Sequence, residues 1–247
     1  MGRLDVELVQ RGICESREKA RRAIMAGTVQ VNGELAHKSS VTVKPNDQLT
    51  LRAPERFVSR GGLKLQQALE QYHLDVHHVV AIDLGASTGG FTDCLLQNGA
   101  ARVYAVDVGH GQLAWKLRRD PRVVVMEKTN ARDLTVKHFP QPFKPVGLVV
   151  VDCSFISLKK ILPAAVALLQ SSGKLIALVK PQFEAGKAEA DRGAGVIRDP
   201  AIHQRILRDL EIFVSKQLGL QWRGVIESPI LGPAGNKEFL VLIEISG

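Results

Sequence analysis

A glycine-rich turn at residues 85–90, between an apolar run and an amphipathic segment, most constrains how this 247-residue chain can fold. The apolar run, residues 79–82, shows no alternation and leads into Asp83. Such a run is typical of a strand buried on both faces, so it predicts a parallel sheet with helices on either side. After the turn, Phe91, Leu95 and Leu96 recur at helical spacing and predict a helix that begins at about residue 90.

The spacing of the glycines indicates which kind of ligand the turn binds. A dinucleotide fingerprint requires Gly-x-Gly-x-x-Gly, but Ser87 stands where the second glycine would be. The next apolar run, residues 103–106, leads into Asp107, 22 residues after Gly85, where a carboxylate can bind a ribose diol. This pattern resembles the S-adenosylmethionine (SAM) site of class I methyltransferases. A purely structural turn in another α/β sheet is the alternative.

The resemblance implies SAM as the cofactor and a Rossmann-like α/β fold with a seven-stranded sheet that ends in an antiparallel hairpin. In such enzymes the segment after the third strand often holds the adenine edge, which here implicates Asn130 or Asp133. The residues that the resemblance assigns to the cofactor are Asp83, Gly85, Ala86, Ser87, Thr88, Gly89, Gly90, Phe91, Asp107, Val108, Asn130, Asp133 and Asp152.

Composition and charge narrow the class of protein further. A net charge of +8 and a pI near 9.6 favour a polyanionic partner. The cysteines Cys14, Cys94 and Cys153 lie far apart, so we expect neither a disulfide framework nor a zinc site, and we predict no metal. The sequence has no apolar run of about 18 residues and no signal peptide, so we expect a cytoplasmic enzyme without a membrane span.

The first 52 residues predict a small α+β domain. Apolar residues at 4–9 predict a short helix, and Ser16 can cap a second helix, residues 17–25. The pair Asn32-Gly33 between alternating apolar residues is a hairpin signal. The second helix is strongly basic, and a basic stripe of this kind contacts phosphates, although a solvated helix face is the alternative. Its basic residues are Arg17, Lys19, Arg21 and Arg22.

The motif SR-x-x-A-x-x-x-I-x-x-G-x-V-x-VNG, between RLDVELVQRG and VKPNDQLTL, resembles the RNA-binding domain named after ribosomal small-subunit protein four. We expect this S-four domain to span residues 1–52, followed by a linker at 53–58 and a catalytic domain at 59–247. The resemblance implies binding to structured ribosomal RNA (rRNA). The predicted RNA contacts are Arg3, Arg17, Lys19, Arg21 and Arg22, with Arg60, Arg118 and Arg119 in the catalytic domain.

The rest of the chain alternates predicted helices and strands. Ser59 is expected to cap a helix at 62–72, with Lys64 on the border of its buried stripe. Residues 184–199 show no periodicity and are predicted to form a mobile loop over the site. Further strands are expected at 123–126, 146–151, 175–179, 222–226 and 239–245, and further helices at 112–119, from Ser157 to a closing Gly173, and from Asp199-Pro200 onward.

Four ionisable residues are expected to meet at one edge of this sheet. Asp152 and Lys180 follow the fourth and fifth strands, and ligands bind outside the carboxyl ends of parallel strands. The last strand should run antiparallel, which brings Glu238 at its start to the same edge, and Lys64 can approach from the preceding helix. A charge that faces water explains each residue alone, but together, beside a SAM turn, they predict an active site.

This set resembles the Lys-Asp-Lys-Glu tetrad of FtsJ-like RNA ribose 2′-O-methyltransferases. With the S-four domain and the motifs SRGGLKL, DLGASTGGFTD, VVDCSFISL, LVKPQFE and GNKEF, the whole chain resembles the TlyA family of rRNA cytidine 2′-O-methyltransferases, some of which are called haemolysins. The resemblance implies methylation of a cytidine ribose in rRNA. The short N-terminus is similar to that of the subtype that acts mainly on large-subunit rRNA.

The chemistry of this reaction explains the residue types. A ribose hydroxyl must lose a proton as it attacks the methyl group of the cofactor. A lysine can accept that proton only if its pKa falls well below ~10.4, and desolvation and a second nearby cation act in that direction. We therefore expect Lys180 to be the general base, Lys64 to assist it or contact the substrate, and Asp152 and Glu238 to orient the two amines.

Other functions remain open from the sequence. A cytosine-C5 methyltransferase would use Cys153 as its nucleophile, but this cysteine stands in Asp-Cys-Ser and not in Pro-Cys or Thr-Cys. An adenine-amino methyltransferase would carry an Asn/Asp-Pro-Pro-Tyr-like motif where this chain has DCSF. A pore-forming haemolysin would need a membrane-spanning segment, and a non-catalytic rRNA chaperone would not need the four ionisable residues.

Overall fold

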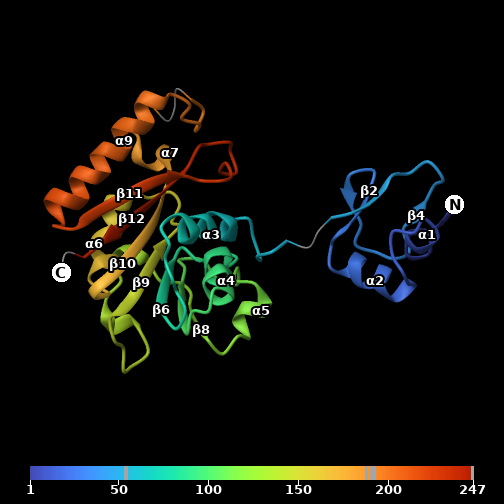
Figure 1. Ribbon diagram of the computed structural model, residues 1–247, viewed down its shortest axis with the longest axis horizontal. Helices are drawn as coiled ribbons and strands as arrows, with labels where there is room; N and C mark the ends of the chain where they lie inside the picture. The colour runs from blue at the N-terminus through green and yellow to red at the C-terminus, as the bar shows by residue number, and fades with distance from the viewer. Residues whose placement is uncertain (53–54, 187–188, 190–192, 246–247) are drawn as a thin grey trace. The chain divides into compact units, whose positions relative to one another are not determined.

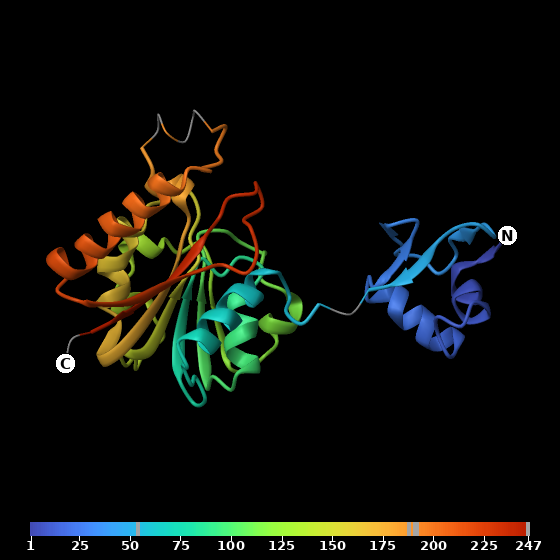
Figure 2. The same ribbon diagram turned by 45° about the horizontal axis from the view of Figure 1, so that its top comes forward.

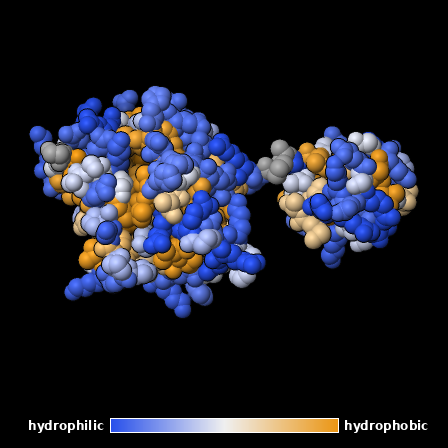
Figure 3. Space-filling view, turned by 60° about the horizontal axis from the view of Figure 1, so that its bottom comes forward, coloured by the Kyte–Doolittle hydropathy of each residue, from blue (hydrophilic) through white to orange (hydrophobic). Residues whose placement is uncertain are grey.

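The computed structural model describes residues 1–52, 55–186, 189 and 193–245 of the chain. The chain divides into two compact units, Met1–Arg56 and Phe57–Gly247, which we call unit 1 and unit 2 and describe separately. In both units helices pack on strands (Figure 1). Hydrophilic residues occupy much of the face of each unit that Figure 3 shows, with hydrophobic residues gathered in patches between them.

Unit 1 packs two helices on two small sheets. Strand β1 pairs with β4, and the other three strands form an antiparallel sheet in the order β3-β2-β5. Leu4, Leu8 and Ile24 from the two helices and Val29 and Val43 from the strands form its core. The predicted small α+β domain is therefore confirmed. The elements are β1 (Gly2–Arg3), α1 (Leu4–Gln10), α2 (Arg17–Met25), β2 (Val29–Val31), β3 (Glu34–Leu35), β4 (Thr42–Val43) and β5 (Leu49–Leu51).

Local signals explain where these elements begin and turn. The Ser16 hydroxyl accepts a hydrogen bond from the Lys19 N–H at 3.2 Å and so caps α2. Asn32 and Gly33 form the two-residue turn between β2 and β3, with φ of 53° and 86°. Both angles lie in the left-handed region, which suits the twist of a tight hairpin and which asparagine and glycine adopt at low cost.

Unit 2 is built on one seven-stranded sheet in the order β11-β12-β10-β9-β6-β7-β8. Strands β10, β9, β6, β7 and β8 run parallel, whereas β12 pairs antiparallel with both β10 and β11. The predicted parallel sheet with a terminal antiparallel hairpin is thus confirmed. The strands are β6 (Val80–Leu84), β7 (Arg102–Val106), β8 (Val123–Met126), β9 (Val146–Val151), β10 (Leu169–Val179), β11 (Gln221–Glu227) and β12 (Phe239–Glu244).

Helices cover both faces of this sheet. The helical elements are α3 (Gly61–Gln71), α4 (Gly90–Gln97), α5 (Trp115–Arg118), η1 (Ala131–Asp133), η2 (Val136–His138), α6 (Leu158–Val166), α7 (Pro181–Glu184), α9 (Pro200–Ile212) and the π-helical turn η3 (Phe213–Gln217). One apolar layer packs α3, α4 and α5 on one face, and a second packs α6 and α9 on the other (Figures 1 and 2). The strands alternate between these layers: Ile82 and Leu84 belong to one, Ala81 to the other.

The sheet also decides which residues share an edge. Because β6, β9 and β10 are parallel, their carboxyl ends bring residues 85–90, 152–155 and 180–183 together. β12 is antiparallel to β10, and its first residue, Phe239, pairs with Val179. Glu238, just before β12, therefore lies at the same edge as Lys180.

Three local predictions were wrong. Ser59 does not cap α3: the N-cap is Arg60, without a side-chain bond, and only the Ser59 carbonyl accepts the Gly62 N–H at 3.2 Å. Gly173 does not close α6, which ends at Val166; it lies inside β10, at an irregularity in the pairing with β9. The helix expected at 112–119 is only α5, because the backbone of Ala114 is extended.

The loop predicted at 184–199 lies partly outside the described residues. Glu184 belongs to α7, and its carboxylate accepts hydrogen bonds from the Ser157 hydroxyl at 2.6 Å and the Leu158 N–H at 2.7 Å. Asp199 caps α9 as predicted and accepts from the Ala201 N–H at 2.8 Å. Within the described ranges, no helix is both long enough and apolar enough to cross a membrane.

Two neighbouring glycines at the start of α3 give a matched test of this packing. A Cβ on Gly62 would lie 2.3 Å from Cγ of the buried Phe57, whereas a Cβ on Gly61 would have its nearest neighbour, Ser59 Oγ, at 3.4 Å. We expect Gly62→Ala to lower the free energy of unfolding by roughly 1–3 kcal/mol through overpacking. Gly61→Ala should change it by less than about 1 kcal/mol. Urea denaturation would measure both, and equal effects would contradict this packing.

Candidate active site

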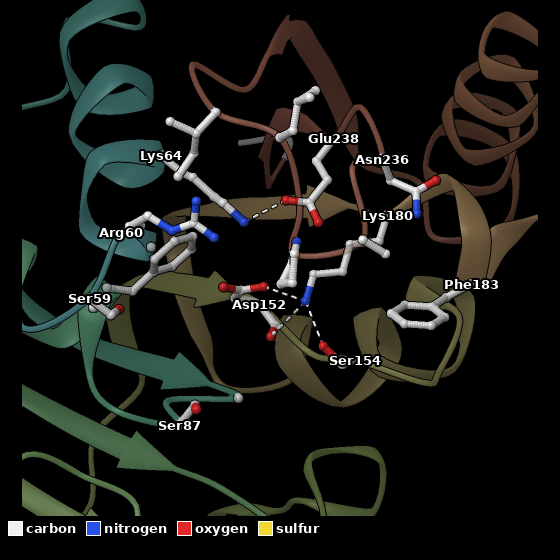
Figure 4. A pocket seen from close by; sticks show the side chains of 18 of the residues that line it. Ser59, Arg60, Lys64, Ser87, Asp152, Ser154, Lys180, Phe183, Asn236 and Glu238 are labelled. Atoms are coloured by element: carbon white, nitrogen blue, oxygen red, sulfur yellow. Dashed lines mark hydrogen bonds and ion pairs between the residues drawn. The ribbon is translucent and has the colours of Figure 1, made fainter. Parts of the chain in front are cut away.

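A cavity of about 600 Å³ opens at the edge of the sheet just described. Segments far apart in the sequence line it: residues 59–64 at the start of α3, the glycine-rich turn, the ends of β9 and β10, Gly195 before α9, and the loop between β11 and β12 (Figure 4). Lys64, Asp152, Lys180 and Glu238 all line it. The expected convergence of these four residues is therefore what the fold produces.

The four residues form two amine–carboxylate pairs. Lys64 Nζ lies 2.5 Å from Glu238 Oε2, and both side chains are buried, with 8% and 1% of their surface exposed. Lys180 Nζ lies 2.7 Å from Asp152 Oδ1 and donates a hydrogen bond to Ser154 Oγ, also at 2.7 Å. Figure 4 shows the two amines pointing into the same cavity from opposite walls. A buried charge requires such a partner, so each pair fixes the positions of its members.

Local structure explains why these side chains lie here. Lys180 lies between the end of β10 and Pro181, the first residue of α7, and its side chain lines the cavity. Lys64 lies on the buried side of α3. Gly232 approaches Glu238 closely, since a Cβ at Gly232 would lie 2.4 Å from Glu238 Oε1. A side chain at Gly232 would therefore displace the Glu238 carboxylate from its present position.

The glycine-rich turn lies against the end of β9. Gly85 has a φ of 86°, and a Cβ there would lie 2.8 Å from the Asp152 carbonyl oxygen. Gly89 has a φ of 96°, and a Cβ there would lie 2.2 Å from Leu117 Cδ1. The turn therefore requires glycine at both positions for conformation and for space. Of its residues, Gly85, Ala86, Ser87, Thr88, Gly90 and Phe91 line the cavity.

Two carboxylates flank this turn. Asp83 is fully buried, and its Oδ2 accepts a hydrogen bond from the Thr92 hydroxyl at 2.7 Å. Burial, together with the negative charge of Asp152, raises the pKa of Asp83 to about 7. Asp107 accepts hydrogen bonds from the Ser87 N–H at 2.7 Å and the Gly109 N–H at 2.6 Å. Asp107 thus holds the turn and the segment after β7 together.

The carboxylates beside the glycine-rich turn fit a ligand that carries a positive charge and a ribose. Among the described residues, Asp83 Oδ1 is buried and finds no hydrogen-bond partner. An unpartnered carboxylate oxygen of this kind favours a positive charge nearby. SAM carries a sulfonium and an ammonium group, and its ribose diol suits Asp107 at the tip of the second strand. The backbone of the turn leaves space for close approach, so the residues present fit this cofactor.

Several predicted cofactor residues lie away from the cavity lining. The lining described above does not include Asp83, Gly89, Asp107, Val108, Asn130 or Asp133. Val108 is 75% exposed. The Asn130 side chain caps η1 by accepting from the Arg132 N–H at 3.1 Å, and it donates to Asp133 Oδ2 at 3.1 Å. Both polar side chains at the expected adenine edge thus bond to their own segment.

The three predicted RNA contacts of unit 2 also differ in whether they line the cavity. Arg60 lines the cavity. Arg118 donates to the Leu113 carbonyl at 3.0 Å and forms an ion pair with Glu127, so it holds α5 to the end of β8. Arg119 is exposed just after the end of α5. Of the three, Arg60 is therefore the one that the fold brings beside the two amine–carboxylate pairs.

Several residues of the cavity are not among those predicted from the sequence. Ser154 and Phe155 follow Asp152, and Phe183 follows Lys180, so proximity to a predicted strand end was the available signal. Asn236 gave no signal, because its role depends on a remote loop: its amide accepts from the Ile197 N–H at 2.9 Å and donates to the Gly195 carbonyl at 2.8 Å. These bonds hold the segment before α9 at the cavity wall.

Cys153 lies in the wrong environment for a nucleophile. Burial, reinforced by the negative charge of Asp152, raises the pKa of its thiol to about 12. Its Sγ lies 3.5 Å from the Leu84 carbonyl oxygen, to which the thiol donates. The described residues that line the cavity do not include it.

Fold and site together define the class: a class I SAM-dependent methyltransferase with SAM as its cofactor. Residues 57–244 match the FtsJ-like methyltransferase family, and residues 2–49 match the S4 domain. The chain therefore belongs to the FtsJ-like methyltransferases. The FtsJ-like family and the S-four domain predicted from the sequence are both confirmed.

Named relatives span nearly the whole chain. A Bacillus subtilis protein, "Putative rRNA methyltransferase YqxC", is 48% identical over 246 residues, which cover 99% of this chain and 86% of the relative. The "16S/23S rRNA (cytidine-2'-O)-methyltransferase TlyA" of Mycobacterium tuberculosis is 45% identical over 241 residues, or 97% of this chain and 88% of the relative. The solved structure of a "Putative hemolysin" from Streptococcus thermophilus is 44% identical in sequence and matches with a TM-score of 0.75. The match covers 99% of this chain and 88% of the Streptococcus chain.

The raised pKa of Asp83 predicts how stability depends on pH. Its pKa is about 7 in the fold against an ordinary value of 3.8, so the unfolded chain releases this proton first as pH rises. Without SAM, the fold should lose the benefit of the protonated carboxyl progressively between about pH 4 and pH 7. Asp83→Asn removes this dependence. As the pH rises from 5.5 to 8, the free energy of unfolding of the variant should therefore increase by about 2 kcal/mol relative to that of the wild type. Urea denaturation at several pH values would measure both proteins. If their free energies of unfolding change with pH in the same way, the raised pKa of Asp83 is contradicted.

Proposed function

We propose that this protein transfers a methyl group from SAM to the ribose 2′-hydroxyl of a cytidine in rRNA, with large-subunit rRNA as the main substrate. One observation carries the proposal: two amine–carboxylate pairs, one buried and one partly exposed, face one cavity beside the glycine-rich turn. The name of the Mycobacterium tuberculosis relative supports cytidine and the 2′-oxygen. A substrate in the ribosome places the enzyme in the cytoplasm.

The chain's own residues divide the work of this reaction. When bound, the cofactor supplies an activated methyl group. Lys180, as general base, accepts the proton of the 2′-hydroxyl while the oxygen attacks. Asp152 and Ser154 hold the Lys180 amine through contacts of 2.7 Å, which directs it toward the substrate oxygen. Lys64, fixed by Glu238, assists Lys180 or contacts the substrate.

The surfaces of both units support an RNA substrate. Unit 1 matches the S4 domain and carries the basic helix α2. In unit 2, Arg60 lies at the cavity, where it can contact a phosphate next to the target ribose. The cofactor contacts that we propose are Asp83, the turn residues 85–91, Asp107, Val108, Asn130, Asp133 and Asp152.

The alternatives predict different products. A C5 or amino methyltransferase would modify the base, whereas a 2′-O-methyl group blocks alkaline cleavage at the modified nucleotide. A non-catalytic chaperone would bind rRNA without binding SAM, and a haemolysin would release dye from liposomes. Mapping methylated riboses in rRNA incubated with the protein and SAM therefore tests the proposal. Methylation confined to the bases would contradict it.

The role of Lys180 has a control lysine in β10, the strand that Lys180 follows. Lys180→Ala should lower the rate of methyl transfer roughly 10²–10⁴-fold, because it removes the proton acceptor, and it should leave SAM affinity nearly unchanged. Lys174→Ala removes a lysine in the middle of β10, where it pairs with Glu244 and does not line the cavity, and should leave the rate unchanged. Radioactive methyl transfer and calorimetric SAM binding would measure both. Retained turnover in Lys180→Ala would exclude the proposed base.

Cys153 separates ribose from base methylation. We expect Cys153→Ala to retain methyl transfer within about twofold, because a thiol with a pKa of about 12 does not supply a thiolate near neutrality. Alkaline hydrolysis of the product RNA should show the same protected nucleotide for variant and wild type. A loss of at least a hundredfold, with unchanged SAM affinity, would instead favour a covalent C5 mechanism.

A further inference from the structure

Asp5, on α1 in unit 1, is a fully buried carboxylate that faces three arginines. Arg3 Nε lies 3.1 Å from Asp5 Oδ1, while Arg17 Nη2 and Arg21 Nε lie 3.0 Å and 3.1 Å from Oδ2. Burial alone would raise the pKa of Asp5, but the three hydrogen bonds outweigh it and hold the pKa well below its usual range. The carboxylate is therefore ionised at neutral pH.

The three arginines remain open to solvent on their other side. Their side chains are about half exposed, at 50%, 53% and 53%. Within the described part of unit 1, each guanidinium directs one nitrogen at Asp5 and makes no other hydrogen bond. Three positive charges against one negative charge leave a local excess of +2. One buried anion thus holds several outward-facing N–H donors in fixed positions.

The other two cations of α2 are held differently. Lys19 and Arg22 form ion pairs with Glu15 and Glu18, one helical turn earlier, and all four side chains are largely exposed. Exposed pairs of this kind contribute little and leave both side chains free to move. Arg21 and Arg22 are therefore neighbours with the same charge but different degrees of preorganisation.

A pocket of about 320 Å³ adjoins the arginine cluster. Arg21 and the exposed Met25 form one wall, and residues 37–40 form the other. That second wall offers the Lys38 amine, the His37 ring and the hydroxyls of Ser39 and Ser40. The Asp5 N–H donates to the Ser39 carbonyl at 3.4 Å, so the residue that holds the arginines also holds this wall.

We propose that Asp5 acts as a positioning residue: it orients Arg3, Arg17 and Arg21, which the sequence already predicts as RNA contacts, toward the phosphodiester backbone of RNA beside this pocket. The proposal rests on the proposed function in taking RNA as the polyanion. Guanidinium groups bind phosphate oxygens through paired N–H donors, which a lysine amine cannot reproduce. An arginine that is already oriented loses less side-chain freedom on binding.

The first test asks whether Asp5→Asn weakens or strengthens RNA binding. Asp5→Asn raises the net charge by one, so simple electrostatics predicts tighter RNA binding. If the arginines lose their orientation, binding should instead weaken. We expect the affinity of the full-length protein for a large-subunit rRNA transcript to fall roughly tenfold. Glu18→Gln makes the same charge change on α2 and should leave affinity equal or higher. Tighter binding by Asp5→Asn would overturn the proposal.

A second pair of variants decides the case if Asp5→Asn does not fold, which circular dichroism would reveal. Arg21→Lys and Arg22→Lys both keep the charge of α2. We expect Arg21→Lys to weaken RNA binding roughly fivefold or more, and Arg22→Lys to change it less than about twofold. Filter binding with the same transcript at 0.05 to 0.2 M salt would measure both. Equal effects of the two substitutions would overturn the proposal.

The outcomes separate this inference from the proposed function. If the wild-type protein does not bind the transcript, or if it binds but never methylates ribose, the proposed function fails. If it binds and methylates, but Asp5→Asn binds more tightly than the wild type or Arg21→Lys matches Arg22→Lys, only the positioning role of Asp5 fails.

Discussion

The ion pair between Lys64 and Glu238 joins residues 174 positions apart and closes the site of unit 2. Neither charge is stable in so dry a place without the other, so the pair requires α3 and the start of β12 to meet. That requirement can be met only because β12 runs antiparallel to β10 and delivers its first residues to the edge where the parallel strands end. The same edge receives Lys180 and Asp152. The geometry of the cavity thus follows from strand direction and from the need to pair buried charges.

Steric limits complete the site. The glycine-rich turn lies so close to β9 that a side chain at Gly85 would meet the Asp152 carbonyl, and α5 presses on Gly89 through Leu117. The cofactor turn, the acid that partners Lys180 and the segment after β7 are therefore one packed assembly. A change at any of these positions is expected to move the others. This explains why the glycine-rich turn and the pair of Lys180 and Asp152 occur in one cavity.

Unit 1 uses the same principle for a different purpose. A buried anion there orients three cations outward instead of neutralising one, and the excess positive charge faces solvent. In both units a buried carboxylate fixes a basic side chain that would otherwise sample many rotamers. The difference lies in the number of cations: one for each carboxylate at the cavity of unit 2, and three for the buried Asp5, whose arginine partners are about half exposed.

Much of this protein was determined by its sequence. The parallel sheet, the terminal hairpin, the cofactor class and the four ionisable residues follow from apolar runs, from glycine spacing and from motifs, because these signals are local. Tertiary structure alone decided which charges pair with which: Lys64 with Glu238, Lys180 with Asp152, and three arginines with Asp5. It also decided the contacts of Asn236, the end of α6 and the N-cap of α3. The reason is that pairing and burial depend on which segments the sheet brings together, and a one-dimensional pattern carries no record of that distance.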